Sequence, residues 1–517
     1  MKNTQSKFFS VVIFALPALA GAIGLLAATP YGIGIYSDST MYLLTARSLL
    51  LGHGYTIDGI PVAIFPPLYP ALLAISGLSG ADPIDAARWL QSIIWAFNIL
   101  WVTMITFRFS EKSVATSIVA SILMLGSVDM IAYHSLALSD GAFLFFSLPA
   151  FLALNIYLEK EKSWYLIASA LLFALASLTR YVGLAWIIGG ILSILLLSRK
   201  SIKGKFLDVL LFGMISSTPG ALWALRNMQY ETVMGRTLDL HPFWGNPEFT
   251  SLVHTVSAWV FQWTVPDSPW LMLIPVFSAA WLLKRMAAQQ RNVPGEFIGR
   301  FYLLFIFVLS FAAVLVFSAA FVQADLFRDS TRLMMPLHAM ILIMALMAGK
   351  EWFKRIYPDG NRRQVIGMWV LFILGVFFVA TGVRYIIRVS VDGQGYASVH
   401  YRYSPLMNAI KNTPQGITIY SNLDLPVALY TGKMLMSIPE KINNTTQRSN
   451  EQYNDQMKSM ASDIRDSSAI LVYFTRKSDW LVYPSLDEIQ RFVALHCRDT
   501  SEDGAVYEAV PDTSEDE

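Results

Sequence analysis

The chain has 517 residues, of which 55% are hydrophobic and only 15% are charged, and its mean hydropathy is positive. This composition excludes an ordinary soluble domain and a disordered chain, and it indicates an integral membrane protein. A formal net charge of +2 gives no reason to expect a nucleic-acid partner.

Apolar segments long enough to cross ~30 Å of hydrocarbon recur along the first three quarters of the chain. They predict an α-helical polytopic membrane protein with about eleven transmembrane helices. The boundary between the fifth and sixth segments is the least defined, and ten to thirteen spans fit the pattern. The first segment favours a retained span over a cleaved signal peptide. The predicted spans are 8–29, 86–108, 113–133, 136–157, 163–180, 182–198, 206–225, 268–285, 300–323, 331–349 and 364–388.

Basic residues predict the orientation, because cytoplasmic loops carry an excess of Lys and Arg. Lysine is confined to alternate loops, and up to the last span the intervening loops contain arginine but no lysine. We therefore expect a plasma (inner) membrane protein with a cytoplasmic N-terminus and an extracytoplasmic C-terminal region. The lone Cys497 cannot form an internal disulfide, which is compatible with a bacterial envelope.

The C-terminal region lacks long apolar runs and is predicted to be a small α/β domain. Residues 415–420 and 469–474 are typical of strands, and residues 450–465 and 485–495 are typical of helices. The predicted organisation is a membrane domain over 1–389 with a first outer loop at 30–85, an extracytoplasmic domain over 390–500, and an acidic tail over 501–517.

Two carboxylates stand out at the predicted outer face of the membrane domain. Asp38 follows the first span in the segment Tyr36-Ser37-Asp38-Ser39-Thr40, and Asp140 lies at the outer end of the fourth span. A carboxylate beside the bilayer is costly unless it has a partner or a purpose. Either residue could also be a helix cap, a common use of Asp, so residue type alone leaves both readings open.

The outer arginines offer the complementary charge. Guanidinium groups bind phosphate through two parallel hydrogen bonds, and Arg180, Arg226 and Arg332 lie at the depth of a lipid phosphate. Arginine also reaches the headgroups without binding anything specific. The histidines His53, His134 and His241 could contribute to a divalent metal site, but their spacing does not predict one.

The first outer loop resembles the GT-C superfamily of membrane glycosyltransferases, in the branch of protein O-mannosyltransferases and aminoarabinose transferases acting on lipid A. Further similarity extends along almost the whole chain. The segments that carry it are Asp38 with Tyr42, Ala46-Arg47-Ser48-Leu49-Leu50, Gly52-His53-Gly54-Tyr55, Phe65-Pro66-Pro67-Leu68-Tyr69-Pro70, Ser177-Leu178-Thr179-Arg180-Tyr181, Tyr420-Ser421-Asn422 and Ala428-Leu429-Tyr430-Thr431-Gly432.

The resemblance implies a GT-C fold, with Asp38 as the catalytic carboxylate and Asp140 as the second functional acid. Aminoarabinose-transferase relatives typically carry a lysine before Pro-Pro-Leu, and Phe65 stands there instead. Other cations must then hold the lipid phosphate, or the donor geometry differs. The side chains predicted to bind substrate are Tyr42, Arg47, His53, Tyr55, Pro66, Pro67, Tyr69, His134, Arg180, Arg226 and Arg332.

The chemistry fits a polyprenyl-phosphate-linked sugar donor and a lipid, glycan or protein acceptor. Such a donor needs a base for the acceptor hydroxyl and positive charge for the departing phosphate, which predicts an inverting displacement with Asp38 as base. Nucleotide sugars are made in the cytoplasm, whereas these acids are predicted to face outward. A lipid or glycan transporter or flippase is the main alternative, and a noncatalytic assembly subunit is another.

Overall fold

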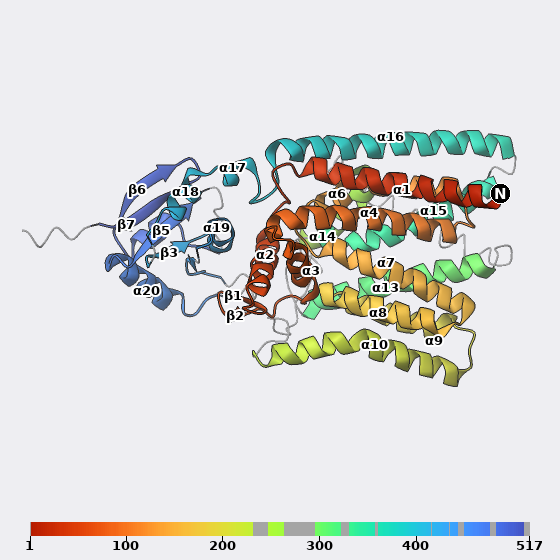
Figure 1. The fold of residues 1–517 in the computed structure, drawn as a ribbon, viewed down its shortest axis with the longest axis horizontal. Coiled ribbons are helices and arrows are strands. Elements are labelled where there is room, and N and C mark those ends of the chain that lie inside the picture. Colours follow the sequence, from red (N-terminus) through yellow and green to blue (C-terminus); the bar gives the residue numbers. More distant parts are fainter. Residues whose placement is uncertain are drawn as a thin grey trace, which may run out of the picture.

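The computed structural model describes residues 2–230, 247–262, 295–321, 330–356, 360–414, 416–433, 435–442, 449–475 and 482–510. Long helices lie side by side in a bundle, and a small mixed α/β domain sits at one end of it (Figure 1). A short layer of helices, α2 and α3, lies between the two.

The predicted span 268–285 falls outside the described residues. Each of the others corresponds to one helix, except 113–133 and 331–349, which each correspond to two consecutive helices. The bundle contains α1 (Lys2–Ala28), α4 (Pro83–Phe109), α5 (Val114–Gly126), α6 (Val128–His134), α7 (Asp140–Lys160), α8 (Ser163–Thr179), α9 (Gly183–Leu197), α10 (Ile202–Met228), α11 (Pro247–Phe261), α13 (Gly295–Phe321), α14 (Ser330–Leu333), α15 (Met335–Ile356) and α16 (Gly360–Asp392).

Fewer of these helices are long and apolar enough to cross a membrane than the eleven spans that the sequence predicted. Among the described residues, five helices are long and apolar enough to cross a membrane, or six if the bent pair α5 and α6 is one span. The two parts of that pair meet at an angle of 61°. Helices α8 and α9 have only 17 and 15 residues, less than the ~20 that a straight span needs. The chain is thus a polytopic helical membrane protein, and the count of eleven stays a prediction.

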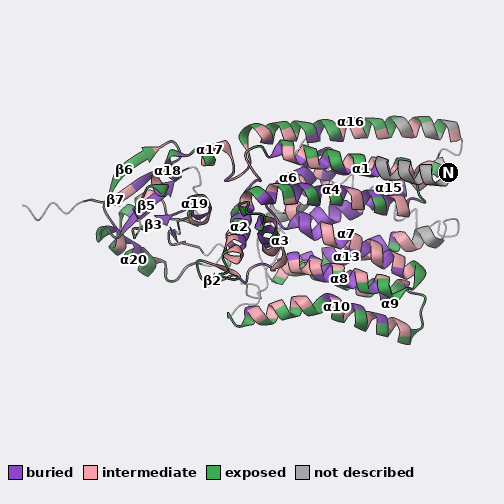
Figure 2. Cartoon of the chain, viewed as in Figure 1, coloured by how far each residue is buried: buried purple, intermediate pink, exposed green. Residues whose placement is uncertain are grey.

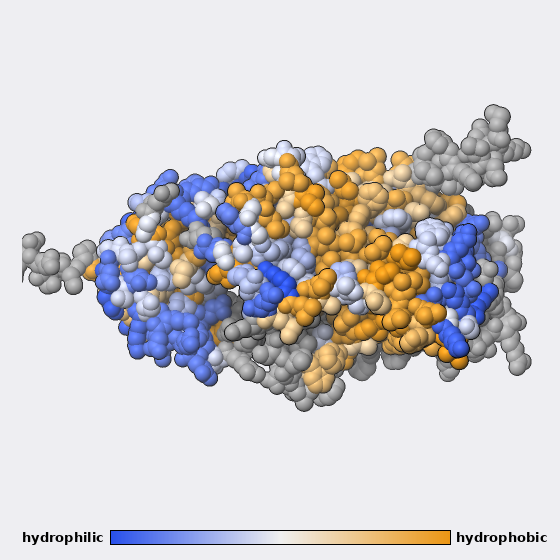
Figure 3. All heavy atoms as spheres, turned by 60° about the horizontal axis from the view of Figure 1, so that its bottom comes forward, coloured by the Kyte–Doolittle hydropathy of each residue, from blue (hydrophilic) through white to orange (hydrophobic). Residues whose placement is uncertain are grey.

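The outer surface of the bundle is apolar, as a lipid-facing surface must be. Side chains such as Trp369, Phe372 and Ile373 on α16 are about 60% exposed, at 60%, 61% and 63%. Burial is concentrated on the inner faces of the helices (Figure 2). An apolar belt crosses the helical part, with polar surface at both ends of it (Figure 3). This pattern matches a bundle solvated by hydrocarbon in its middle.

The first outer loop folds into α2 (Ser37–Leu50), a hairpin of β1 (Thr56–Ile57) and β2 (Ile60–Pro61), and α3 (Leu68–Gly77). One apolar cluster joins this loop to the C-terminal domain, with Tyr42, Leu43 and Tyr69 on one side and Ile419 and Val427 on the other. This shared core fixes the loop between the bundle and the domain.

Backbone hydrogen bonds tie three distant segments together beneath α2. Gly34 N donates to Ser135 O and Ala137 N donates to Gly34 O, both at 2.9 Å, and Tyr396 N donates to Ile35 O at 2.8 Å. A side chain at Gly34 would be crowded here, because a Cβ would lie 2.9 Å from the Cβ of Gln394 and 3.1 Å from the Ser135 carbonyl oxygen. This junction sets the start of α2 against the start of α7.

The C-terminal domain is a five-stranded sheet of order β4-β3-β5-β7-β6 with short helices around it. Strand β3 pairs in parallel with β4 and β5, while β7 is antiparallel to both β5 and β6. Its elements are α17 (Val399–Arg402), α18 (Pro405–Lys411), β3 (Thr418–Ser421), α19 (Asp424–Thr431), β4 (Met436–Ser437), α20 (Tyr453–Arg465), β5 (Ala469–Phe474), α21 (Leu486–Gln490), β6 (Leu495–Ser501) and β7 (Gly504–Ala509).

The predicted strands at 415–420 and 469–474 correspond to β3 and β5, and the predicted helices correspond to α20 and α21. Strand β7, however, lies within the stretch that we predicted to be an acidic tail. Its Ala505 and Val506 are buried against β5, so these residues form part of the sheet and the tail begins after Ala509.

Candidate functional site

The structure brings the two predicted acids together through one arginine. Arg332, on α14, donates from Nη1 to Asp38 Oδ2 at 2.7 Å and from Nε to Asp140 Oδ2 at 3.0 Å. Arg180, directly after α8, pairs with Asp140 Oδ1 at 2.5 Å. We call these four residues the acid–arginine cluster. Its members come from α2, α7, α14 and the end of α8, and their formal charges sum to zero.

The two acids differ sharply in exposure. The Asp140 side chain is 1% exposed, and each of its oxygens faces a guanidinium group. The Asp38 side chain is 48% exposed and bridges to Arg332 through Oδ2. Because a buried and doubly paired carboxylate cannot reach an incoming molecule, Asp38 is the acid of this cluster that is open to a substrate.

Helix geometry explains why both acids are tolerated. Asp38 lies in the first turn of α2, and Asp140 is the first residue of α7. The N-terminus of a helix carries partial positive charge and unpaired N–H groups, which favour a carboxylate. Both acids thus lie at the start of a helix, but neither is the N-cap residue, which is Tyr36 in α2 and Ser139 in α7.

An aromatic wall supports the cluster. The ring of Tyr42, one turn after Asp38, packs edge-on against Phe65 at 4.5 Å and Tyr69 at 5.1 Å between centroids. Its hydroxyl lies 3.2 Å from Ser139 Oγ, next to Asp140. Burial and the Asp38 charge raise the pKa of Tyr42, so this hydroxyl stays protonated at neutral pH. Phe65, at the position where the resemblance led us to expect a lysine, is thus a packing residue for Tyr42.

A buried polar network lies behind Asp140. Asn98 Nδ2 lies 2.9 Å from both His134 Nε2 and the Gly141 carbonyl, to which it donates. Since an amide nitrogen only donates, His134 Nε2 accepts and its Nδ1 donates to Met130 O at 2.7 Å. Gln91 Nε2 donates to the Tyr69 hydroxyl at 2.8 Å and to two backbone carbonyls. This network fixes the start of α7.

Arg226 holds the hairpin of the first outer loop rather than the cluster. Its Nη1 donates to Val62 O at 2.6 Å, its Nη2 donates to Tyr55 O at 3.3 Å, and the guanidinium lies 4.6 Å from the Trp223 ring centroid. Tyr55 in turn donates from its hydroxyl to Pro66 O at 3.1 Å. These contacts place Arg226, Tyr55 and Pro66 in the support of the loop.

The remaining predicted residues lie around the cluster. Arg47 pairs with Asp82 at 2.8 Å and donates to Leu429 O at 2.5 Å, so it joins the loop to the C-terminal domain. His53 is exposed in the loop after α2. Pro67 is the residue that precedes the first turn of α3.

The described residues contain no group of three or more His, Cys, Asp or Glu side chains placed to hold a metal ion. His134 is fully buried with both ring nitrogens engaged, and His53 lies on an exposed loop. His241 falls outside the described residues.

Sequence reasoning named the acids and arginines of the cluster but not their pairing, since Asp38 and Arg332 are 294 residues apart in the chain. It also missed Gln91, Asn98 and Ser139. Gln91 and Asn98 could have been found from the sequence, because they lie two turns apart in an apolar span. An unpaired polar group is costly there, so both amides can be expected to have buried partners.

No protein-family model matches the chain, and no curated protein matches it by sequence. By structure, the chain is similar to ArnT from Cupriavidus metallidurans bound to undecaprenyl phosphate, with a TM-score of 0.62, 13% identity, and coverage of 97% of this chain and 98% of that chain. The apo state of that protein gives a TM-score of 0.61, 13% identity, and coverage of 98% of both chains.

The chain is also similar to the archaeal oligosaccharyltransferase AglB from Archaeoglobus fulgidus in complex with an inhibitory peptide and a dolichol-phosphate. That match has a TM-score of 0.51 and 12% identity, and it covers 91% of this chain and 70% of that chain. At these identities the likeness shows the fold alone. The predicted resemblance is confirmed at that level, as an ArnT-like GT-C fold over nearly the whole length.

Proposed function

We propose that this chain is an integral membrane glycosyltransferase that moves a sugar from a polyprenyl-phosphate carrier to an acceptor hydroxyl on the extracytoplasmic face. The observation that carries the proposal is the acid–arginine cluster, in which a half-exposed Asp38 and a buried Asp140 share Arg332. The fold supports a lipid-phosphate donor, because the similar structures named above hold undecaprenyl phosphate and a dolichol-phosphate.

Asp38 is the base in this mechanism. Its exposed carboxylate accepts the proton of the acceptor hydroxyl while the hydroxyl oxygen attacks the anomeric carbon. The bond from that carbon to the phosphate oxygen breaks in the same step, and the lipid phosphate departs with the electron pair. Attack opposite the leaving group inverts the anomeric configuration.

The arginines receive the departing phosphate. Arg332 donates from Nε to Asp140 and from Nη1 to Asp38, so its guanidinium lies beside the base. Arg180 pairs with Asp140 through Nη1. Fixed guanidinium groups in a site that excludes water stabilise developing negative charge strongly. With Phe65 in place of a lysine, these two arginines supply the positive charge of the cluster.

Asp140 is a positioning residue in this proposal. It touches both arginines but is itself buried, so it sets their orientation instead of meeting the substrate. His134 and Asn98 act one step further away, because they fix the backbone at Gly141 beside it. This assigns His134 to support of the site. Tyr42, which is buried against Phe65 and Tyr69, supports it as well, and the arginines remain as substrate contacts.

The alternating lysine pattern supports an arrangement with a cytoplasmic N-terminus, eleven spans, and the cluster and the C-terminal domain outside. In this arrangement the acceptor, whether lipid, glycan or protein, approaches from the outer surface.

The test is to incubate the purified full-length protein in proteoliposomes with a panel of radiolabelled polyprenyl-phosphate sugars, with and without a chelator. We expect one label to leave its lipid and appear on an acceptor or in water. Label that crosses the bilayer while it stays on the lipid would identify a flippase and contradict the proposal. The chelator arm decides whether a divalent metal ion takes part.

A further inference from the structure

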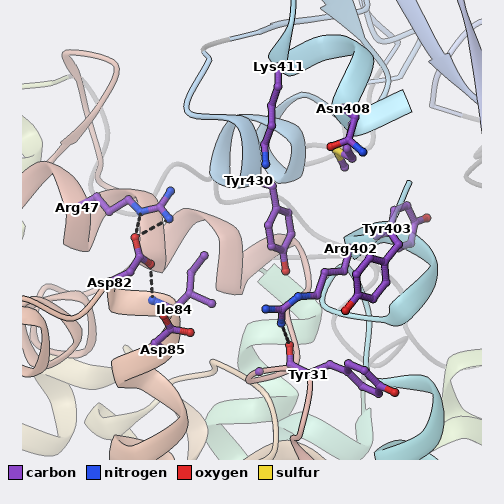
Figure 4. A pocket seen from close by; sticks show the side chains of 13 residues that line it. Tyr31, Arg47, Asp82, Ile84, Asp85, Arg402, Tyr403, Asn408, Lys411 and Tyr430 are labelled. Carbon is purple, nitrogen blue, oxygen red and sulfur yellow. Dashed lines mark hydrogen bonds and ion pairs between the residues drawn. The ribbon is translucent and has the colours of Figure 1, made fainter. Parts of the chain in front are cut away.

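A pocket of about 330 Å³ lies between the membrane domain and the C-terminal domain, apart from the acid–arginine cluster. Lys411 and Tyr430 reach into it from the C-terminal domain, toward Tyr31 and Asp85 of the membrane domain (Figure 4). Volumes from about 300 Å³ upward are typical of small-molecule sites. The pocket is therefore large enough to hold a ligand of one or two sugar units.

The walls of this pocket are held by interactions between the two domains. Arg47 donates to Asp82 Oδ2 from Nε at 3.1 Å and from Nη2 at 2.8 Å, and it reaches Leu429 O from Nη1 at 2.5 Å. On the opposite side, Arg402 donates from Nη1 to the Tyr31 carbonyl. Of the three cations that line the pocket, Arg47 and Arg402 thus hold its walls together, and Lys411 does not.

Other groups in the pocket are available to a ligand. Within the described ranges, the Tyr31 and Tyr430 hydroxyls, the Asn408 amide, the Lys411 ammonium and the Asp85 carboxylate have no protein partner. They provide both donors and acceptors, and the tyrosines add flat apolar ring faces.

This combination of hydrogen-bonding groups and aromatic rings favours one class of ligand. A sugar presents hydroxyls that both donate and accept, together with C–H faces that pack on aromatic rings. The charges of the available Lys411 and Asp85 balance, so the open groups do not favour an inorganic anion. An apolar ligand would leave the polar groups unpaired at a cost in free energy. The lining thus favours an uncharged carbohydrate over both.

Helix α2 separates the pocket from the cluster. Asp38 and Arg47 are nine residues apart on this helix, which is about 14 Å along its axis and two and a half turns around it. The two side chains therefore lie on opposite sides of α2. A ligand in the pocket does not occupy the place of the sugar donor.

We infer that this pocket binds a neutral carbohydrate segment of the acceptor, at a second contact remote from the reacting hydroxyl. The statement that the bound carbohydrate belongs to the acceptor rests on the proposed glycosyltransferase function. The statement that the pocket binds carbohydrate does not depend on that function. The acceptor is then a glycan-bearing molecule at the outer membrane surface.

The experiment measures binding of fluorescently labelled neutral trisaccharides of glucose, mannose and N-acetylglucosamine to the full-length protein in detergent. We expect at least one to bind saturably and excess inorganic phosphate not to displace it. Asp85→Asn should weaken binding roughly fivefold and Tyr430→Ala roughly tenfold, as expected for one lost hydrogen bond and for a lost ring with its hydroxyl. Lys458→Gln, at an exposed site on α20, is the control and should bind as the wild type does.

A second readout separates this inference from the proposed function. Tyr430→Ala should raise the KM for a glycan acceptor and leave hydrolysis of the sugar donor by water unchanged. Three results would overturn the carbohydrate site even if sugar transfer occurs: none of the trisaccharides binds, phosphate displaces the bound trisaccharide, or both variants bind as tightly as the wild type. Trisaccharide binding with an unchanged acceptor KM overturns the assignment to the acceptor.

Discussion

Asp140→Asn tests whether Asp140 holds the cluster together. The substitution keeps the size of the side chain and removes its charge. Arg180 and Arg332, each 14% exposed, then lose a charged partner that is 1% exposed. Removing one partner of a buried ion pair typically costs about 3–5 kcal/mol. We expect a loss of about 3 kcal/mol in the free energy of unfolding, at the lower end of this range, because Arg332 keeps Asp38.

Asp82→Asn is the matched control. Asp82 pairs with Arg47 at side-chain exposures of 40% and 28%, and it caps α4 by accepting from Ile84 N at 2.9 Å. Asn is an equally good N-cap, so only an exposed ion pair is lost, at a cost of about 0–1 kcal/mol.

The assay is unfolding of both purified variants in detergent by denaturant titration, with thermal unfolding as a second probe. The account predicts that Asp140→Asn is clearly less stable than Asp82→Asn. Equal stability of the two variants, with sugar transfer lost only in Asp140→Asn, would refute the positioning role and make Asp140 a catalytic acid.

Gly141→Ala should lower the free energy of unfolding by about 1–3 kcal/mol and also lower sugar transfer, because the new Cβ would lie 2.9 Å from a ring carbon of His134; unchanged transfer would contradict the role of this contact. The hydrogen bond from Ser485 N lowers the pKa of Glu488, so this group stabilises the fold above the pKa of an unfolded glutamate, about 4.3, and the contribution is lost as the pH falls through the lower folded pKa. The difference in unfolding midpoint between wild type and Glu488→Gln should therefore shrink on acidification, and a difference independent of pH would argue against it. A membrane-impermeant thiol reagent should label the exposed Cys497 in intact cells, with Cys497→Ser as control. Labelling only after lysis would reverse the proposed orientation.

Helices and strands were predictable from the sequence where a local run of apolar residues or a local capping pattern determines them. The apolar run of α4 and its Asp82-Pro83 start lie close to the predicted span 86–108. Strand β5 coincides with its prediction because six consecutive apolar residues fill a sheet interior that is buried on both faces.

Long-range pairing was not predictable in this way. The predicted fourth span began at residue 136, whereas α7 begins at Asp140, because residues 135–137 instead pair their backbone with Gly34. Strand β7 was missed because its acidic surroundings resemble a solvated tail, and only pairing with β5 makes it a strand. In both cases the deciding partner lies far away in the sequence.

The same distinction applies to the site. Residue type and loop position were enough to name Asp38, Asp140 and Arg332. Which acid is buried and which is open depends on how α2, α7 and α14 meet, and no single segment contains that information. The sequence named Asp38 as the base and Asp140 only as a second functional acid, whereas the structure gives the two acids measurably different exposures.

The most direct measurement of the central claim is the rate at which purified Asp38→Asn moves labelled sugar from the polyprenyl-phosphate donor that the wild type uses. Asp38 is half-exposed, and the largely buried Arg332 keeps its pair with Asp140, so we expect stability to fall by about 1 kcal/mol, the upper end of the range for exposed pairs. Loss of the base should lower transfer by about 10²–10⁴-fold. A folded Asp38→Asn protein that transfers sugar at the wild-type rate would contradict the account.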